Sequence, residues 1–196
     1  MDSNRELVKY LERTGWLTTD RVKKAFLRTD RKAFVPAESR DMAYVDKPVY
    51  LSDGSTISAP HIVARITELA EIRPGLSVLE IGSGSGYQLK ILSFLAGEVT
   101  GIEPVKGLVE TSRRNLQDRE NIEVVVGKAP GDVKEVYDRI IVSYGISVDD
   151  WDVLKEKLSE GGVMVGAVES NGEQRLRKYR NGKEEIFERV RFVRSR

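Results

Sequence analysis

The stretch that decides the fold is VLEIGSGSGY, residues 78–87, where an apolar run meets three closely spaced glycines. The apolar run has the composition of a buried strand, and the residues after it have the spacing of a helix. Gly82, Gly84 and Gly86 therefore fall on a strand-to-helix turn, where glycine lets the backbone approach a ligand that a Cβ would exclude. Such a loop alone is a weak functional signal, because its G-x-G-x-G spacing differs from the G-x-G-x-x-G of dinucleotide-binding folds.

Strand and helix patterns alternate along the chain after this loop. We expect strands separated by helices, with the strands at 76–82, 98–103, 122–127, 137–143 and 161–169 and the helices at 87–95, 106–116 and 149–158. Continuous apolar strands separated by helices indicate a parallel sheet that is covered on both faces. The tail differs, because QRLRKYR and EEIFERVRFV alternate in polarity around Asn181-Gly182, which predicts an antiparallel hairpin at the sheet edge.

The N-terminal region carries two helical patterns, at 4–13 and 20–28. A polar stretch follows, SDGSTISAPH at 52–61, and its last residues open another amphipathic helix. We therefore predict an α/β fold: a doubly wound, Rossmann-like, mostly parallel sheet with an antiparallel C-terminal hairpin and an N-terminal helical cap. Residues 1–58 would form the cap and an active-site loop, and residues 59–196 the Rossmann-like domain, in one compact unit.

The amino-acid composition limits the kinds of reaction that the side chains of this protein can catalyse. The 196 residues include 32 Lys and Arg and 31 Asp and Glu, so the net charge of +1 gives no general attraction to nucleic acid or membranes. No apolar run could span a bilayer, and the N-terminus has no signal-peptide core, so we expect a cytoplasmic protein. The chain has no cysteine and one histidine, which excludes thiolate nucleophiles and Cys-ligated zinc and disfavours a His-based metal site. The chemistry must rely on oxygen ligands, backbone groups or a cofactor.

Two acids accompany the glycine loop. Glu80 precedes Gly82 by two residues, where its carboxylate would repel a pyrophosphate but attract a ligand that carries an ammonium and a sulfonium. S-adenosylmethionine is such a ligand. Glu103 ends the next strand, where an acid can bond both ribose hydroxyls in folds of this kind. The alternative is a tight turn flanked by two solvated acids.

With the loop placed, the chain resembles the protein-L-isoaspartyl O-methyltransferase family over nearly all of residues 4–168. The similarity lies in RKAFVPAESRDMAYVDKPVYL, DGSTISAPHIVARITELAEI, VLEIGSGSGYQLKILS and YDRIIVS. The TISAPH segment is specific to this family, whereas the other motifs are shared with class I methyltransferases generally. The resemblance implies a Rossmann-like enzyme that uses S-adenosylmethionine to methylate the free carboxylate of L-isoaspartyl residues in damaged proteins, which starts their repair.

The resemblance also implies a set of site residues. Ser58 matches the position described as catalytic, and it follows Thr56 and Ile57 in the segment that lines the active site. The expected cofactor-binding residues are Thr56, Ile57, Glu80, Gly82, Ser83, Gly84, Gly86, Glu103, Gly127 and Lys128. Ser58 could instead be the N-cap of the next helix, and both roles can hold at once. His61 can simply occupy the first turn of that helix.

The sequence departs from the family pattern at three places. After the third strand the family usually has Gly-Asp-Gly, whose acid bonds the adenine amino group, whereas Lys128 follows Gly127 here. Lysine cannot accept that bond, so Asp132 or a backbone carbonyl replaces it, or cofactor affinity is lower. Tyr144 is expected near the same pocket. The sequence ends at FVRSR, short of the longer tail that helps the family close over its substrate.

Methyl transfer to a carboxylate suits a chain with so little histidine. The accepting acid has a reference pKa of about 4 and is already ionised at neutral pH, so no general base is required. The expected partners are isoaspartyl proteins or peptides, with no nucleic acid and no membrane, and the chain is expected to be a monomer. Two alternatives remain: an RNA or nucleoside methyltransferase, although the Asn-Pro-Pro-Tyr-type tetrapeptide is absent, and a non-catalytic or weakly active S-adenosylmethionine-binding relative.

Overall fold

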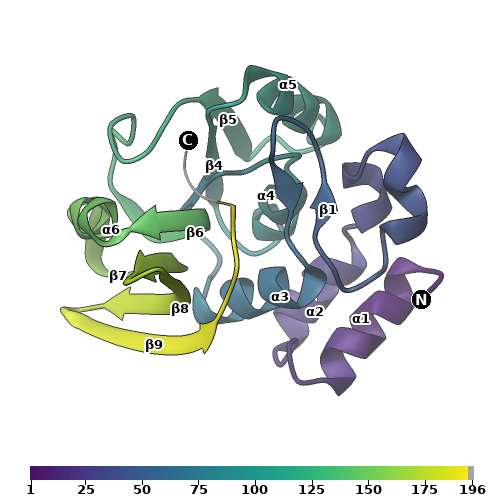
Figure 1. The fold of residues 1–196 in the computed structure, drawn as a ribbon, viewed down its shortest axis with the longest axis horizontal. Coiled ribbons are helices and arrows are strands. Elements are labelled where there is room, and N and C mark those ends of the chain that lie inside the picture. The colour runs from purple at the N-terminus through teal and green to yellow at the C-terminus, as the bar shows by residue number, and fades with distance from the viewer. Residues whose placement is uncertain (194–196) are drawn as a thin grey trace.

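A seven-stranded sheet organises the protein, whose computed structural model describes residues 1–193 (Figure 1). Residues 194–196, the end of the predicted 59–196 domain, lie outside the described residues. The strand order is β5-β4-β3-β6-β7-β8-β9, with bounds β3 Ser77–Ile81, β4 Glu98–Glu103, β5 Ile122–Val126, β6 Tyr137–Ser147, β7 Leu158–Ser170, β8 Glu173–Arg180 and β9 Lys183–Arg189. The first five strands in this order, β5, β4, β3, β6 and β7, pair in parallel with their neighbours. Strand β8 pairs antiparallel with β7, and β9 pairs antiparallel with β8. The predicted mostly parallel sheet with a C-terminal hairpin is confirmed.

The two faces of the sheet are covered unequally. Side chains alternate across a strand, so Val78 of β3 belongs to one buried cluster and Leu79 to the other. The first face lies under α3 (Pro60–Leu69), α4 (Tyr87–Ser93) and α5 (Lys106–Asn115). The second face is covered by α6 (Val148–Lys155) and by the loop that carries Ala129 and Val133. The doubly wound arrangement is present, with only one helix on its second side within residues 1–193.

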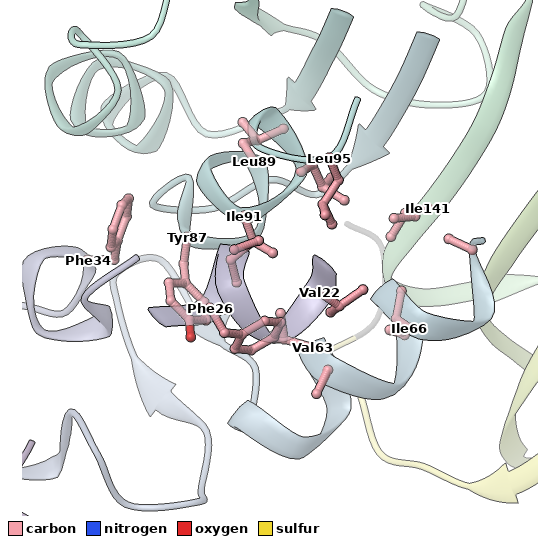
Figure 2. Packing of buried hydrophobic residues seen from close by; sticks show 14 of the residues in the cluster. Val22, Phe26, Phe34, Val63, Ile66, Tyr87, Leu89, Ile91, Leu95 and Ile141 are labelled. Atoms are coloured by element: carbon pink, nitrogen blue, oxygen red, sulfur yellow. The ribbon is translucent and has the colours of Figure 1, made fainter. Parts of the chain in front are cut away.

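The N-terminal cap packs onto the helix that follows the glycine loop. It consists of α1 (Asn4–Arg13), α2 (Asp20–Leu27), η1 (Arg31–Phe34) and η2 (Ala37–Met42). Figure 2 shows Phe26 and Phe34 of the cap beside Tyr87 of α4, with ring centroids 6.3 and 5.6 Å from that of Tyr87. Burial of these aromatic rings joins the cap and the first face of the sheet in one core.

A small hairpin occurs where the sequence predicted only a polar loop. Strands β1 (Val49–Tyr50) and β2 (Thr56–Ile57) pair antiparallel, with Tyr50 opposite Thr56. The turn between them places Asp53 at φ 47° and Gly54 at φ 70°. An Asp-Gly pair favours such left-handed turn positions, so the signal for the hairpin was present in the sequence.

Strand β6 is longer than the expected 137–143. Its pairing with β7 shifts register between Val142 and Gly145 and then continues to Ser147. A bulge of this kind redirects side chains, and Tyr144 lies within it, at the end of the sheet where the glycine loop is.

No helix among residues 1–193 is long and apolar enough to cross a membrane.

Candidate active site

Two adjoining cavities lie at the carboxyl ends of β3, β4 and β6, the edge where open α/β sheets bind ligands. The first, the glycine-loop cavity, lies between Gly82, Glu103, Lys128 and Tyr144. The second, the serine cavity, is lined by polar residues that include Ser58, Glu80, Ser85 and Gln88. Thr56, Gly82, Gly84 and Ser143 line both cavities.

The three glycines of the loop have different surroundings. Gly82 has φ +82°, and a Cβ there would lie 2.9 Å from Cδ1 of Tyr144. Gly84, at φ +54°, lines both cavities. Gly86 lies outside both linings, and a Cβ on it would come within 2.5 Å of Oγ of Ser112. Two glycines therefore open the cavities, and the third lets α4 pack against α5.

Glu103 is positioned by the loop that it faces. Its side chain is 4% exposed, Oε2 accepts a hydrogen bond from the Gly84 amide at 3.0 Å, and Oε1 accepts one from the Val105 amide at 3.1 Å. Burial raises the pKa of the Glu103 carboxyl, and the two amide bonds only partly oppose this. Each carboxylate oxygen has a further lone pair available, which suits the two hydroxyls of a ribose.

Glu80 lies deeper and lines the serine cavity. Its Oε1 accepts a hydrogen bond of 2.9 Å from the Ser143 hydroxyl, whereas Oε2 has no partner among the described residues. Burial raises the pKa of the Glu80 carboxyl to about 8, the Ser143 bond opposes that rise, and the charge of Glu103 adds to it. A buried carboxylate oxygen without a donor fits a ligand that carries an ammonium group.

Four more residues that line the serine cavity each carry a buried polar atom without a hydrogen-bond partner among residues 1–193. These atoms are the side-chain oxygens of Ser83, Ser85 and Tyr87 and Nε2 of Gln88. Buried polar groups are nearly always paired, so such a concentration marks a place where a polar ligand or water completes the bonds. The donors and acceptors present fit the charged amino-acid end of S-adenosylmethionine and a substrate carboxylate.

The Thr-Ile-Ser segment reaches this site along β2. Thr56 lines both cavities, and Ile57 and Ser58 line the serine cavity. The alternative role of Ser58 as an N-cap is wrong, because Ala59 is the N-cap of α3 and Pro60 opens the helix without a side-chain cap bond. The Ser58 hydroxyl makes no hydrogen bond to any described residue, so it is available to a ligand.

His61 lies outside both cavities. Its backbone amide and its Nδ1 both contact Oδ1 of Asp46, at 3.0 and 2.8 Å, and its ring packs 5.1 Å from that of Trp16. Burial alone would raise the pKa of Asp46, but the bonds to His61 hold it below the ordinary value. The polar stretch at 52–61 is therefore part hairpin, part cavity wall and part helix start.

The loop after β5 carries the departure from the family pattern. Gly127 and Lys128 line the glycine-loop cavity. Oδ2 of Asp132 accepts a 2.7 Å hydrogen bond from the Lys128 amide, and Asp132 is absent from the lining of the cavity. Asp132 thus supports the loop without lining the cavity.

The C-terminal segment completes the cavity in a way that the sequence did not indicate. In Figure 1 the chain leaves β9 and returns toward β6, where the Gly145 amide donates a 2.8 Å hydrogen bond to the Val193 carbonyl. The Phe192 amide donates to Oε1 of Gln174 at 2.6 Å. Phe192 and Val193 thereby become a wall of the glycine-loop cavity.

The sequence analysis also did not identify Ser143 as a site residue. Its place as a polar residue at the carboxyl end of a buried strand could have indicated it.

Comparisons with known proteins agree with this geometry. Residues 2–194 match the family described as protein-L-isoaspartate(D-aspartate) O-methyltransferase. A protein-L-isoaspartate O-methyltransferase of Hyperthermus butylicus is 40% identical over 179 residues, which cover 84% of this chain and 74% of the relative. The enzyme of the same name from Pyrobaculum arsenaticum is 41% identical over 182 residues, covering 89% and 88%.

A solved structure extends the likeness to three dimensions. It is a Plasmodium falciparum protein assigned to the protein-L-isoaspartate O-methyltransferases, crystallised with S-adenosyl-L-homocysteine. The TM-score is 0.84 at 27% identity, and the match covers 98% of this chain and 97% of that one.

Proposed function

The chain belongs to the protein-L-isoaspartate(D-aspartate) O-methyltransferase family, and on that premise we propose that it methylates the free carboxylate of L-isoaspartyl residues in damaged proteins and peptides. The observation that carries the proposal is that the TISAPH segment and the glycine loop with its two acids, which are distant in sequence, line adjoining cavities. Ser58, from the family-specific TISAPH segment, lines one cavity together with Glu80, and that cavity adjoins the one that holds Glu103.

The cofactor is S-adenosylmethionine, and we propose how the chain holds it. Glu103 accepts from the ribose hydroxyls, and Gly82 and Gly84 give the ligand room along the backbone. Gly127 and Lys128 contact the adenine through their backbone. Ser83 and Glu80 face the charged amino-acid end, and Thr56 and Ile57 separate it from the substrate. Gly86 acts indirectly, since it sets the position of α4.

When bound, S-adenosylmethionine supplies a methyl group on a positively charged sulfur. The side chains of the protein align the substrate and exclude water from it. The accepting carboxylate, with a reference pKa of about 4, needs no general base, so its orientation is the main requirement. The Ser58 hydroxyl, which has no partner among the described residues, can donate to that carboxylate.

We further propose a cytoplasmic monomer that does not bind nucleic acid, with residues 1–58 serving as the cap and active-site loop of the 59–196 methyltransferase domain. The absence of nucleic-acid binding is supported by the basic side chains of the C-terminal strands, several of which pair with acidic side chains of the same chain. Arg177 pairs with Glu184 at 2.9 Å, and Arg180 pairs with Glu71 at 3.0 Å. These arginines form an ion-paired strand surface, unlike the free basic stripe of a nucleic-acid site.

The product of the reaction provides the test. The methyl ester of an isoaspartyl residue is attacked by the next peptide nitrogen, which closes a succinimide ring and expels methanol. Two peptides that differ only in Asp or isoAsp at one position are incubated with methyl-labelled S-adenosylmethionine and then moved to alkaline pH. We expect label on the isoAsp peptide alone, followed by its release as volatile methanol.

Other outcomes identify the alternatives. Equal labelling of both peptides, or label that never becomes volatile, contradicts the isoaspartyl assignment, because methyl groups on nitrogen have no such release route. Calorimetric binding of S-adenosylmethionine without any methyl transfer would instead indicate a non-catalytic relative, an alternative raised by Lys128 at the adenine position.

A further inference from the structure

Arg31 of η1 is a fully buried cation to which the proposed reaction assigns no role. Its side chain is 0% exposed, and it forms no ion pair with any described residue. The nearby carboxylate of Asp46 acts on it at a distance but is bonded to the His61 ring at 2.8 Å. Burial lowers the pKa of the Arg31 guanidinium, since an ion without a full counter-charge is costly to desolvate.

The guanidinium donates only to backbone carbonyls, and these come from two separate segments, residues 43–47 and Ser58. Nη1 donates to Ala43 at 2.7 Å, and Nη2 donates to Lys47 and to Ser58, both at 3.1 Å. The Ser58 carbonyl belongs to a residue that lines the serine cavity. Arg31 therefore holds the Thr-Ile-Ser segment from outside the serine cavity, whose lining does not include it.

A second wall of the serine cavity also lies against Arg31. The guanidinium carbon is 6.0 Å from the ring centroid of Tyr87, a residue that lines the cavity and whose buried hydroxyl group has no partner among the described residues. Figure 2 shows Phe26 and Phe34 beside that ring, which keeps water away from this side. In so dry a setting the charge of a guanidinium acts over several ångströms with little screening.

We propose that Arg31 is a positioning residue for the methyl-accepting carboxylate, which it serves by fixing the Ser58 backbone and by making the serine cavity favour an anion over a neutral group of the same shape. The proposal rests on the proposed function, because the anion is the isoaspartyl carboxylate. The Glu103 carboxylate, which lines the adjoining glycine-loop cavity, would repel that anion, and the charge of Arg31 offsets this repulsion.

The test compares two ligands on the same protein. One is an isoaspartyl peptide, and the other is the same peptide with its free carboxylate replaced by a carboxamide. Dissociation constants are measured by calorimetry with S-adenosylhomocysteine present. Wild type should bind the acid about tenfold or more tightly than the amide, and Arg31→Met should lose most of that ratio. Arg31→Lys, which keeps the charge but not the three-carbonyl geometry, should retain the ratio and lose kcat.

Arg139→Met is the matched control. Arg139 is also buried and also donates to three backbone carbonyls, those of Ala70, Asp138 and Glu71, but it lies at the far end of β6. The Arg139→Met variant should have a lower Tm than wild type but the same ratio of the two dissociation constants. A purely structural Arg31 would behave in the same way, so an unchanged ratio in Arg31→Met overturns the proposal. If that variant does not fold, a folded Arg31→Lys that loses the ratio overturns it equally. Wild type that cannot methylate the acid peptide would contradict the proposed function instead.

Discussion

A hydrogen bond links the loop after β3 to the end of the neighbouring strand β4: the Gly84 amide donates to Oε2 of Glu103 at 3.0 Å. The carboxylate is thus oriented by the same loop whose glycine lines both cavities. An acid held in this way keeps its place before any ligand arrives, so little ordering remains to oppose binding.

The first prediction concerns this acid. Glu103→Ala should weaken S-adenosylhomocysteine binding by about 1–3 kcal/mol, because the ribose hydroxyls lose a buried acceptor. Isothermal titration calorimetry measures the change. Glu98→Ala, at the exposed opposite end of β4, is the control and should bind as wild type does. Equal affinity in Glu103→Ala and wild type would remove Glu103 from the cofactor site.

The second prediction is a pH dependence caused by Glu80. Its pKa is about 8 in the folded chain against an ordinary 4.5, so the folded state binds the proton more tightly than the unfolded state. Stability from this group is therefore fully present below pH 4.5 and is lost as the pH rises toward 8. Glu80→Gln should gain stability relative to wild type across that window, by a few kcal/mol at its upper end.

Chemical denaturation at several pH values between 5 and 8.5 measures the Glu80 effect. Other titrating groups cancel in the difference between the two proteins, because Gln keeps the shape of Glu and can still accept from Ser143. A stability difference that does not change with pH would contradict the raised pKa of Glu80.

The third prediction separates catalysis from folding at Ser58. Since Ala59 and not Ser58 caps α3, Ser58→Ala should leave Tm and cofactor affinity nearly unchanged. Methyl transfer to an isoaspartyl peptide should fall by roughly 10²-fold, because the carboxylate loses an aligning donor. Ser52→Ala, in the same segment but outside both cavities, serves as the control. Full turnover in Ser58→Ala would exclude Ser58 from the active site.

The fourth prediction addresses the C-terminal wall. Phe192→Ala should speed the dissociation of S-adenosylhomocysteine, because the apolar cover over the glycine-loop cavity is removed. Gln174→Ala should act in the same direction, since Gln174 both accepts from the Phe192 amide and donates to its carbonyl. Stopped-flow displacement measures the rates, with Arg191→Ala as the control because its side chain is exposed. Unchanged rates in both test variants would show that this wall does not retain the ligand.

The elements that rest on local pattern could be predicted from the sequence. The alternation of apolar strands and helices, the glycine turn at 82–86 and the edge hairpin around Asn181-Gly182 all depend on residues within one or two turns of each other. The family assignment also came from short contiguous motifs and is confirmed. Even the unpredicted β1–β2 hairpin had a local signal in Asp53-Gly54, which was overlooked.

The chemistry of the site was decided by tertiary structure. Glu80 and Glu103 look alike in sequence, yet burial raises the pKa of Glu80 to about 8. Glu80 lines a cavity together with Ile57, Val63 and Gln88, which come from other elements. Phe192 becomes a cavity wall only because Gln174 and Gly145 hold the returning chain. Burial and desolvation depend on which distant segments close over a group, and a linear pattern does not contain that information.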